Sequence, residues 1–327
     1  QARGFTGVSP SPLARIAAAR ASQDTTFGEQ WDELIKHSDL VQREARPDGE
    51  WLSRLHAVHA RALALFARKP DASLYHLIYT SAHSTERYSA LHGLLCLVVS
   101  REVARMVGWP DELLDSLEAA SLTMNVSMRR LQDLLAAGEP RITPDMRAEI
   151  DNHPERSVAL LRSAGVQDPV WLTIVQHHHD DFGAGVLPDS AEPGLRAAQV
   201  LARVDVFTAK ISRRAPRAPM SPLMAARQGC LGPDGRPDEL GSALLRAMGL
   251  YPPGSFVELA NGEAGIVISR GRMANQPVVA ALMSASGAPL SPPMVRNAWE
   301  GRFAVKRVMG PDELRVRPPH EQLMSLR

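Results

Sequence analysis

The sequence has few cysteines, few aromatic residues and almost no net charge. Its 327 residues include two cysteines, Cys96 and Cys230, which provide no disulfide framework and indicate a reducing cytoplasm. Aromatic residues make up 5% of the chain, too few for a platform on which bases would stack. The formal net charge of +1 creates no basic field of the kind that attracts nucleic acids. We therefore expect no nucleic-acid partner.

Long apolar runs are also missing. No stretch of roughly 18 apolar residues occurs, so we expect no membrane span. The N-terminus has no charged-then-apolar signal pattern. Hydrophobic residues make up 44% and charged residues 22%, which is typical of a globular protein. These features together predict a soluble, cytoplasmic chain of one large domain or two smaller ones.

Apolar residues recur at helical spacing through the first two thirds of the chain. The spacing predicts helices in residues 13–70 and again in residues 71–211. Pro144 and Pro169 each follow a residue that caps helices, which predicts two helix starts. A loop rich in Arg, Pro and Gly follows, and a short helix is expected at residues 240–248.

Strand patterns replace helical ones near the C-terminus. The stretches that read as strands are 256–259, 265–269, 278–282 and 303–309. Asn261-Gly262 lies between the first two and predicts a hairpin turn. The chain is thus expected to be mainly α, with a small β-rich C-terminal domain. The predicted divisions are a helical N-terminal region at 1–75, a main helical domain at 76–220, a linker with a short helix at 221–250 and the β-rich domain at 251–327.

The strongest local signal for chemistry is the run His177-His178-His179 at a predicted helix end. At least one ring should face the interior or a cleft, because apolar residues precede it at helical spacing. Neutral imidazole is the commonest metal ligand, so contact with a metal or a phosphate is one interpretation. The alternative is a solvated helix end, where histidine is favourable against the helix dipole.

Three further residues could join such a site. His153 is held at a bend by Pro154, although a single histidine at a bend is usually structural. Asp205 lies among apolar residues, and a buried carboxylate requires a cation, a metal or several donors. His92 lies inside the apolar stripe of an earlier helix. Together these residues outline a metal site inside a helical bundle.

The order of these residues resembles the HD-GYP family, a branch of the HD phosphohydrolases. Active members of that family hydrolyse cyclic di-GMP with two or three bound metal ions. The residues that match the metal-ligand motifs, in order, are His92, His153, His177, His178 and Asp205. The resemblance covers roughly residues 85–220 and implies an HD-domain helical bundle.

Two arginines match positions that contact substrate phosphates in the family. Arg214 and Arg217 follow Asp205 in a basic loop. Arginine suits bidentate contact with phosphate. The alternative is that these side chains, like most in basic loops, are simply solvated.

The sequence departs from the family at its defining motif. Thr123 replaces the ligand His, Met124 the bridging Asp and Ser127 the catalytic Lys. Tyr88 stands where a Glu often precedes the first His, and His179 replaces the acidic residue after the His pair. Hydrolysis with two metals requires a bridging oxygen ligand, whereas a thioether is uncharged and soft. We therefore predict that Thr123, Met124 and Ser127 are not catalytic residues.

These departures favour a degenerate, non-catalytic signalling protein that acts through protein contacts or senses a nucleotide in an eroded cleft. The alternative is a metal-dependent phosphohydrolase acting on cyclic di-GMP or another phosphoester. Its reduced site would hold one Zn, Fe or Mn ion, and an empty site is the remaining option. A third class of function is that of a purely structural or interaction module. A homodimer fits a signalling protein, and a protein partner or a cyclic dinucleotide is the expected ligand.

Overall fold

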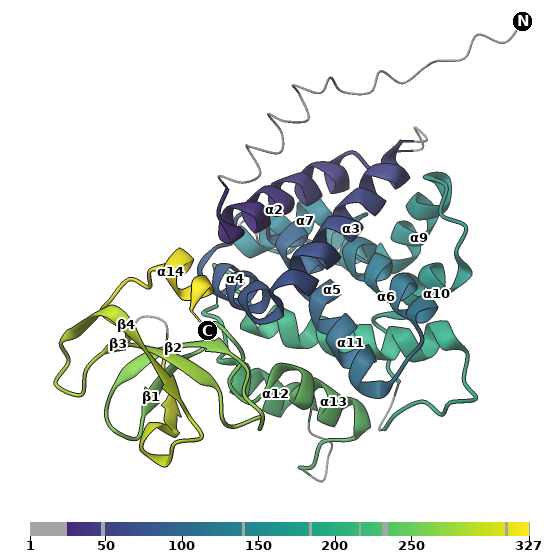
Figure 1. Ribbon diagram of the computed structural model, residues 1–327. Helices are drawn as coiled ribbons and strands as arrows, with labels where there is room; N and C mark the ends of the chain where they lie inside the picture. Colours follow the sequence, from purple (N-terminus) through teal and green to yellow (C-terminus); the bar gives the residue numbers. More distant parts are fainter. Residues whose placement is uncertain are drawn as a thin grey trace, which may run out of the picture.

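The protein is mainly helical and carries a small antiparallel sheet near its C-terminus (Figure 1). The computed structural model describes residues 25–46, 50–138, 141–182, 185–215, 217–230, 235–310 and 313–326. Residues 1–24 of the predicted N-terminal region lie outside the described residues. The predicted mainly α architecture with a β-rich C-terminal part is confirmed.

The helices follow one another from residue 27 to residue 248. They are α2 (Phe27–Arg43), α3 (Trp51–Arg68), α4 (Pro70–His83), α5 (Tyr88–Val107), α6 (Asp111–Thr123), α7 (Arg129–Ala137), α8 (Pro144–Asp151), α9 (His153–Ser163), α10 (Pro169–His177), α11 (Pro193–Ile211), α12 (Pro222–Cys230) and α13 (Glu239–Met248). The two predicted starts are confirmed, since Thr143 and Asp168 accept backbone N–H groups as caps of α8 and α10. No helix in the described ranges combines the length and the apolar composition that crossing a membrane requires.

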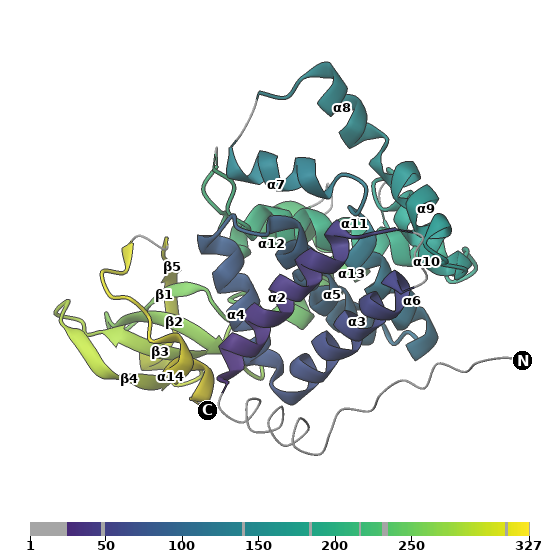
Figure 2. The ribbon, with the colours of Figure 1, turned by 90° about the horizontal axis from the view of Figure 1, so that it is seen from above.

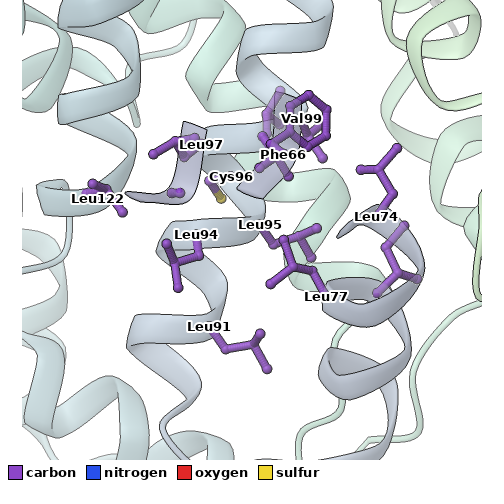
Figure 3. Packing of buried hydrophobic residues seen from close by; sticks show 14 of the residues in the cluster. Phe66, Leu74, Leu77, Leu91, Leu94, Leu95, Cys96, Leu97, Val99 and Leu122 are labelled. Atoms are coloured by element: carbon purple, nitrogen blue, oxygen red, sulfur yellow. The ribbon is translucent and has the colours of Figure 1, made fainter. Parts of the chain in front are cut away.

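Helix α5 runs through the centre of the helical part. Every residue from 88 to 100 is buried, as expected of a helix that is apolar on all sides. It contacts α2, α4, α6, α7, α11 and α13. Figure 3 shows its side chains together with Phe66 of α3 and Leu77 of α4. The N-terminal helices thus share one hydrophobic core with the main helical part, and the division at residue 75 stays a prediction.

The sheet is an antiparallel arrangement of five strands in the order β4-β3-β2-β1-β5. The strands are β1 (Phe256–Leu259), β2 (Ala264–Ser269), β3 (Val278–Met283), β4 (Pro289–Asn297) and β5 (Val305–Val308). The first three predicted strands are confirmed, and β1 pairs with β2 across the predicted Asn261-Gly262 turn. The predicted strand at 303–309 is shorter, because a 3-10 turn occupies Gly301–Phe303.

Strand β4 was not among the predicted strands. It contains three prolines, Pro289, Pro292 and Pro293, which have no N–H to donate to a neighbouring strand. Prolines are tolerated at the edge of a sheet, and β4 is an edge strand that pairs with β3 alone. The edge position of β4 in the sheet, rather than its local sequence, therefore explains why these residues form a strand.

The two faces of the sheet have different neighbours. Alternate residues of a strand point to opposite faces. Phe256, Ile266 and Ile268 join the main hydrophobic core, whereas Val257 and Val267 belong to a small second cluster on the other side. The sheet therefore packs one face against the helices, and α4 contacts β2 directly.

Arg270, just after β2, joins the sheet to three helices. Its Nε donates to Asp71 of α4 at 2.5 Å, and its Nη1 donates to Glu102 of α5 at 2.6 Å. The same Nη1 donates to the carbonyl oxygen of Ala247 in α13 at 2.7 Å. These bonds fix the position of the sheet relative to the helical core.

A short C-terminal helix, α14 (His320–Ser325), returns to the helical part beside α4 (Figure 1). Leu323 and Met324 are buried, and α14 contacts α2 and α4. The His320 ring lies 4.2 Å from the Tyr79 ring between centroids, and its Nδ1 lies 2.8 Å from the Tyr75 hydroxyl. The helix is too short for a helical period in the sequence, so only its tertiary contacts define it.

Because α14 docks with its His320 ring partly buried, we expect the protein to be less stable in mild acid than at neutral pH. Burial lowers the pKa of His320 to about 4, and the nearby His76, His83 and Arg317 act in the same direction. Above pH 6.5 the ring is neutral in both folded and unfolded chains. Between pH 6.5 and about 4 only the unfolded chain binds the proton, so stability falls as the pH falls.

Urea unfolding at pH 7, 5.5 and 4.5 measures this effect. Replacing His320 by Gln keeps a polar side chain that does not titrate. The wild type should lose more stability than His320→Gln between pH 7 and 4.5. Equal losses in the two proteins would show that His320 does not control the acid sensitivity.

Candidate metal centre

Four helices bring the predicted ligands to one region of the helical part. The predicted residues are His92 on α5, His153 at the start of α9, His177 at the end of α10, His178 directly after it and Asp205 on α11. Helix α10 packs against α9 and α11, and α11 packs against α5. The structure arranges four of them, His92, His153, His178 and Asp205, in two neighbouring groups that also include His179 and Cys96.

Three histidines form the first group, the three-His group: His153, His178 and His179. Each offers one nitrogen atom, and these atoms all lie within 4.8 Å of one another. His153 and His178 are buried, whereas His179 is exposed. The group therefore opens to solvent on one side.

The two buried rings of this group present unprotonated nitrogens to each other. The Nδ1 of His153 lies 2.5 Å from the carbonyl oxygen of Ile150, and the Nδ1 of His178 lies 2.8 Å from that of Val175. A carbonyl oxygen only accepts, so both Nδ1 atoms must donate. In neutral rings each Nε2 then carries a lone pair, and the two Nε2 atoms are 3.2 Å apart. Two lone pairs this close favour a shared cation, either a proton or a metal ion.

Burial disfavours the proton as that cation. It lowers the pKa of His178 to about 3, and the nearby His179 and His153 add to the effect. Burial likewise lowers the pKa of His153. Both rings are therefore neutral near pH 7, which is the form that binds metals. Backbone carbonyls that hold Nδ1 also orient the rings, as they do around metal sites in general. The residues present fit one metal ion.

His177 does not lie in this group. Its side chain is 37% exposed and its Nδ1 lies 2.6 Å from the carboxylate of Asp180. Adjacent residues on a helix point about 100° apart, so His177 and His178 cannot both face the interior. The chain turns after α10 and brings His179 back instead. The sequence signal was the seven-residue spacing from Trp171 to His178, which places His178 on the buried face.

His92, Cys96 and Asp205 form the second group. The Nε2 of His92 lies 2.7 Å from a carboxylate oxygen of Asp205 and 3.6 Å from the Sγ of Cys96. Cys96 also contacts the Thr208 hydroxyl at 3.2 Å. Cys96 was not among the residues predicted for the site. Its spacing of four from His92 was the available signal, because such residues share a helix face.

The ligand atoms of this second group also lie within 4.8 Å of one another, and two of its members, His92 and Asp205, favour each other's charged form. Burial opposes a charged His92, but Cys96, Tyr88 and the bond to Asp205 raise its pKa well above the usual value. Burial also opposes a charged Asp205, yet the bond and charge of His92 hold its pKa well below the usual range. The pair is therefore an ion pair at neutral pH, with the carboxylate 15% exposed. The Asp205 charge also acts on His153 and His178, so the two groups are electrostatic neighbours.

Tyr88 and Arg214 cover the His92 side of the site. The Tyr88 hydroxyl accepts bonds from Nε and Nη2 of Arg214 at 3.1 and 2.9 Å. The Tyr88 ring stacks on the His92 ring with an interplanar angle of 13°. Arg214 is thus held by the Tyr88 hydroxyl and ring, and no carboxylate within the described ranges forms an ion pair with it. Arg217 is exposed, and its guanidinium donates to the Ala209 carbonyl oxygen at 3.0 Å.

The three residues Thr123, Met124 and Ser127 all make contacts inside the protein. The Thr123 hydroxyl donates to the Ala119 carbonyl and accepts from Trp171 Nε1, both at 2.8 Å. Met124 is 1% exposed and packs in the core. The Ser127 hydroxyl donates to the His153 carbonyl at 3.0 Å. None of them supplies a carboxylate that could bridge two metal ions.

One curated relative is similar to this chain. It is described as a cyclic di-GMP phosphodiesterase of Pseudomonas aeruginosa, and it is 23% identical over 78% of this chain. The chain spans 64% of the length of that relative. No family model matches the chain, and no solved structure matches it with statistical significance. The similarity places this protein near a signalling family, while its own chemistry is a separate question.

Proposed function

We propose that this protein is a degenerate HD-type relative of cyclic di-GMP phosphodiesterases that binds one metal ion and signals without hydrolysis. The main observation that supports this proposal is the division of its histidines into two groups. The three-His group presents facing lone pairs that suit one ion. His92 and Asp205 instead bond to each other, at 2.7 Å between Nε2 and a carboxylate oxygen. A two-metal centre would need both parts and a bridging carboxylate, which Met124 does not supply.

The ion would be held by His153, His178 and His179. Three imidazoles are a common ligand set for Zn²⁺, and such a site keeps one position open. When bound, the ion would supply a positive charge able to attract a phosphate oxygen. The protein itself would contribute Arg214, whose guanidinium contacts only the neutral Tyr88 hydroxyl among the bonds described for it. This combination supports recognition of a cyclic dinucleotide, and output through protein contacts.

Hydrolysis remains the second candidate because Asp205 lies beside the three-His group. A carboxylate released from His92 could orient a reacting group near His178. Hydrolysis would require the His92–Asp205 ion pair to separate, and each charge would then lose the stabilisation that the other provides. Turnover is therefore expected to be much lower than that of a complete two-metal site.

The deciding experiment measures metal content and turnover on the same samples. Protein reconstituted separately with Mn²⁺, Fe²⁺ and Zn²⁺ is assayed with cyclic di-GMP, and binding of the nucleotide is measured in parallel by calorimetry. We expect about one ion per chain and no hydrolysis. Metal-dependent turnover that disappears in His178→Ala would overturn the non-catalytic proposal in favour of the second candidate. Absence of any metal after reconstitution would overturn both.

A further inference from the structure

A small basic cavity lies on the other side of the molecule's core, where α13 meets the loop between β2 and β3. Its volume is about 200 Å³, and its lining includes Arg246, Arg270, Arg272 and Tyr251. None of the described residues that line it is acidic. Asp71 and Glu102 compensate the charge of Arg270, so the uncompensated positive charge at this cavity comes from Arg246 and Arg272.

Arg270 enters this cavity as a rigid donor. Its Nε and Nη1 are held by Asp71, Glu102 and the Ala247 carbonyl, so the guanidinium cannot turn freely. Its remaining nitrogen, Nη2, takes part in none of these three bonds. The side chain is 20% exposed and lines the cavity. The cavity thus has one donor whose position is fixed before binding.

Arg246 and Arg272 add two adjustable donors at the rim. Both are exposed, and neither forms an ion pair within the described ranges. Gly271 keeps the loop narrow, because a Cβ there would lie 1.7 Å from the Gln276 carbonyl oxygen. The loop backbone can therefore approach a ligand closely while the two arginines close over it.

We propose that this cavity binds a phosphate group. Guanidinium groups match the oxygens of phosphate in pairs, and a doubly charged anion balances more of their charge than a carboxylate does. A cavity of about 200 Å³ is smaller than the roughly 300–1,000 Å³ that holds a drug-sized ligand. It accommodates inorganic phosphate or the phosphate end of a larger molecule, with the remainder in solvent.

Such binding would strengthen the contact between the sheet and the helices. Arg270 already links the sheet to α4, α5 and α13. A phosphate shared by Arg246 and Arg272 would add further bonds across the same junction. This inference does not rest on the histidine site, and a failed test here leaves the proposed function untouched.

Calorimetric titration with inorganic phosphate tests the proposal, using the full chain at constant ionic strength set with chloride. The variants are Arg246→Gln and Arg272→Gln. The matched control is Arg147→Gln, an exposed arginine of α8, which Figure 2 shows at the edge of the helical part away from the sheet. We expect saturable binding of one phosphate that weakens about tenfold or more in each cavity variant and is unchanged in the control.

Either of two results would overturn the site. One is that the wild type shows no saturable binding, and the other is that the double variant Arg246→Gln/Arg272→Gln binds phosphate equally well. A second titration with a nucleoside 5′-monophosphate identifies the source of the phosphate. Tighter binding of the monophosphate, with the same sensitivity to both variants, supports a phosphoester as the ligand. Tighter binding of inorganic phosphate supports the free anion.

Discussion

Replacing His178 by Ala should abolish stoichiometric metal binding, whereas replacing the adjacent His177 should leave it intact. His178 is buried and faces the Nε2 of His153 at 3.2 Å, while His177 bonds to Asp180 at the surface. Removing one of three ligands is expected to weaken binding by about 100-fold or more, at least as much as the loss of an outer-shell partner. Elemental analysis and competition with a chromophoric chelator give the affinity of both variants for Zn²⁺.

His179→Ala keeps this test decisive if the buried substitution prevents folding. His179 is exposed, so its loss should weaken metal binding without affecting the core. Far-UV circular dichroism shows that each variant is folded. Loss of metal in His177→Ala, with retention in His178→Ala and His179→Ala, would contradict the three-His assignment.

Replacing Glu118 by Ala should lower the free energy of unfolding by about 3–5 kcal/mol. The Glu118 carboxylate on α6 is fully buried and pairs with Arg101 of α5. Its second oxygen lies 2.6 Å from Nε2 of His59 on α3. The two partners are only about 15% exposed, so the substitution leaves a largely buried arginine without its counter-charge. Urea unfolding at pH 7 measures the loss.

Glu112→Ala provides the matched control on the same helix. Glu112 is exposed in the first turn of α6, so its loss should change stability by no more than about 0.5 kcal/mol. Glu118→Gln should be less harmful than Glu118→Ala because it keeps the shape and one acceptor. A loss below about 1 kcal/mol in Glu118→Ala would show that water replaces the carboxylate at this junction.

Local signals in the sequence were sufficient for most of the fold. Caps at Thr143 and Asp168, and the Asn261-Gly262 turn, depend on neighbouring residues alone, and the structure confirms all three. Strand β4 and helix α14 lack such signals. The first is rich in proline and the second is six residues long, so both are defined by the surfaces on which they pack.

The candidate site was predictable only in outline. The sequence placed His153, His178 and Asp205 in one region, because their order along the chain resembles a known family. It did not distinguish His177 from His179, since three adjacent histidines at a helix end differ only in where the chain turns. Nor did it indicate that Cys96 would contact His92.

By itself the sequence determined the residue types, namely the histidines that can bind a metal and the thioether of Met124 at a position where the family resemblance implies a carboxylate. Only the tertiary structure decided how those residues are paired. The bond between His92 and Asp205 joins residues 113 positions apart, and that between Tyr88 and Arg214 joins residues 126 positions apart. Such contacts depend on the packing and rotation of α5 against α11 and the loop that follows it, which no local pattern encodes.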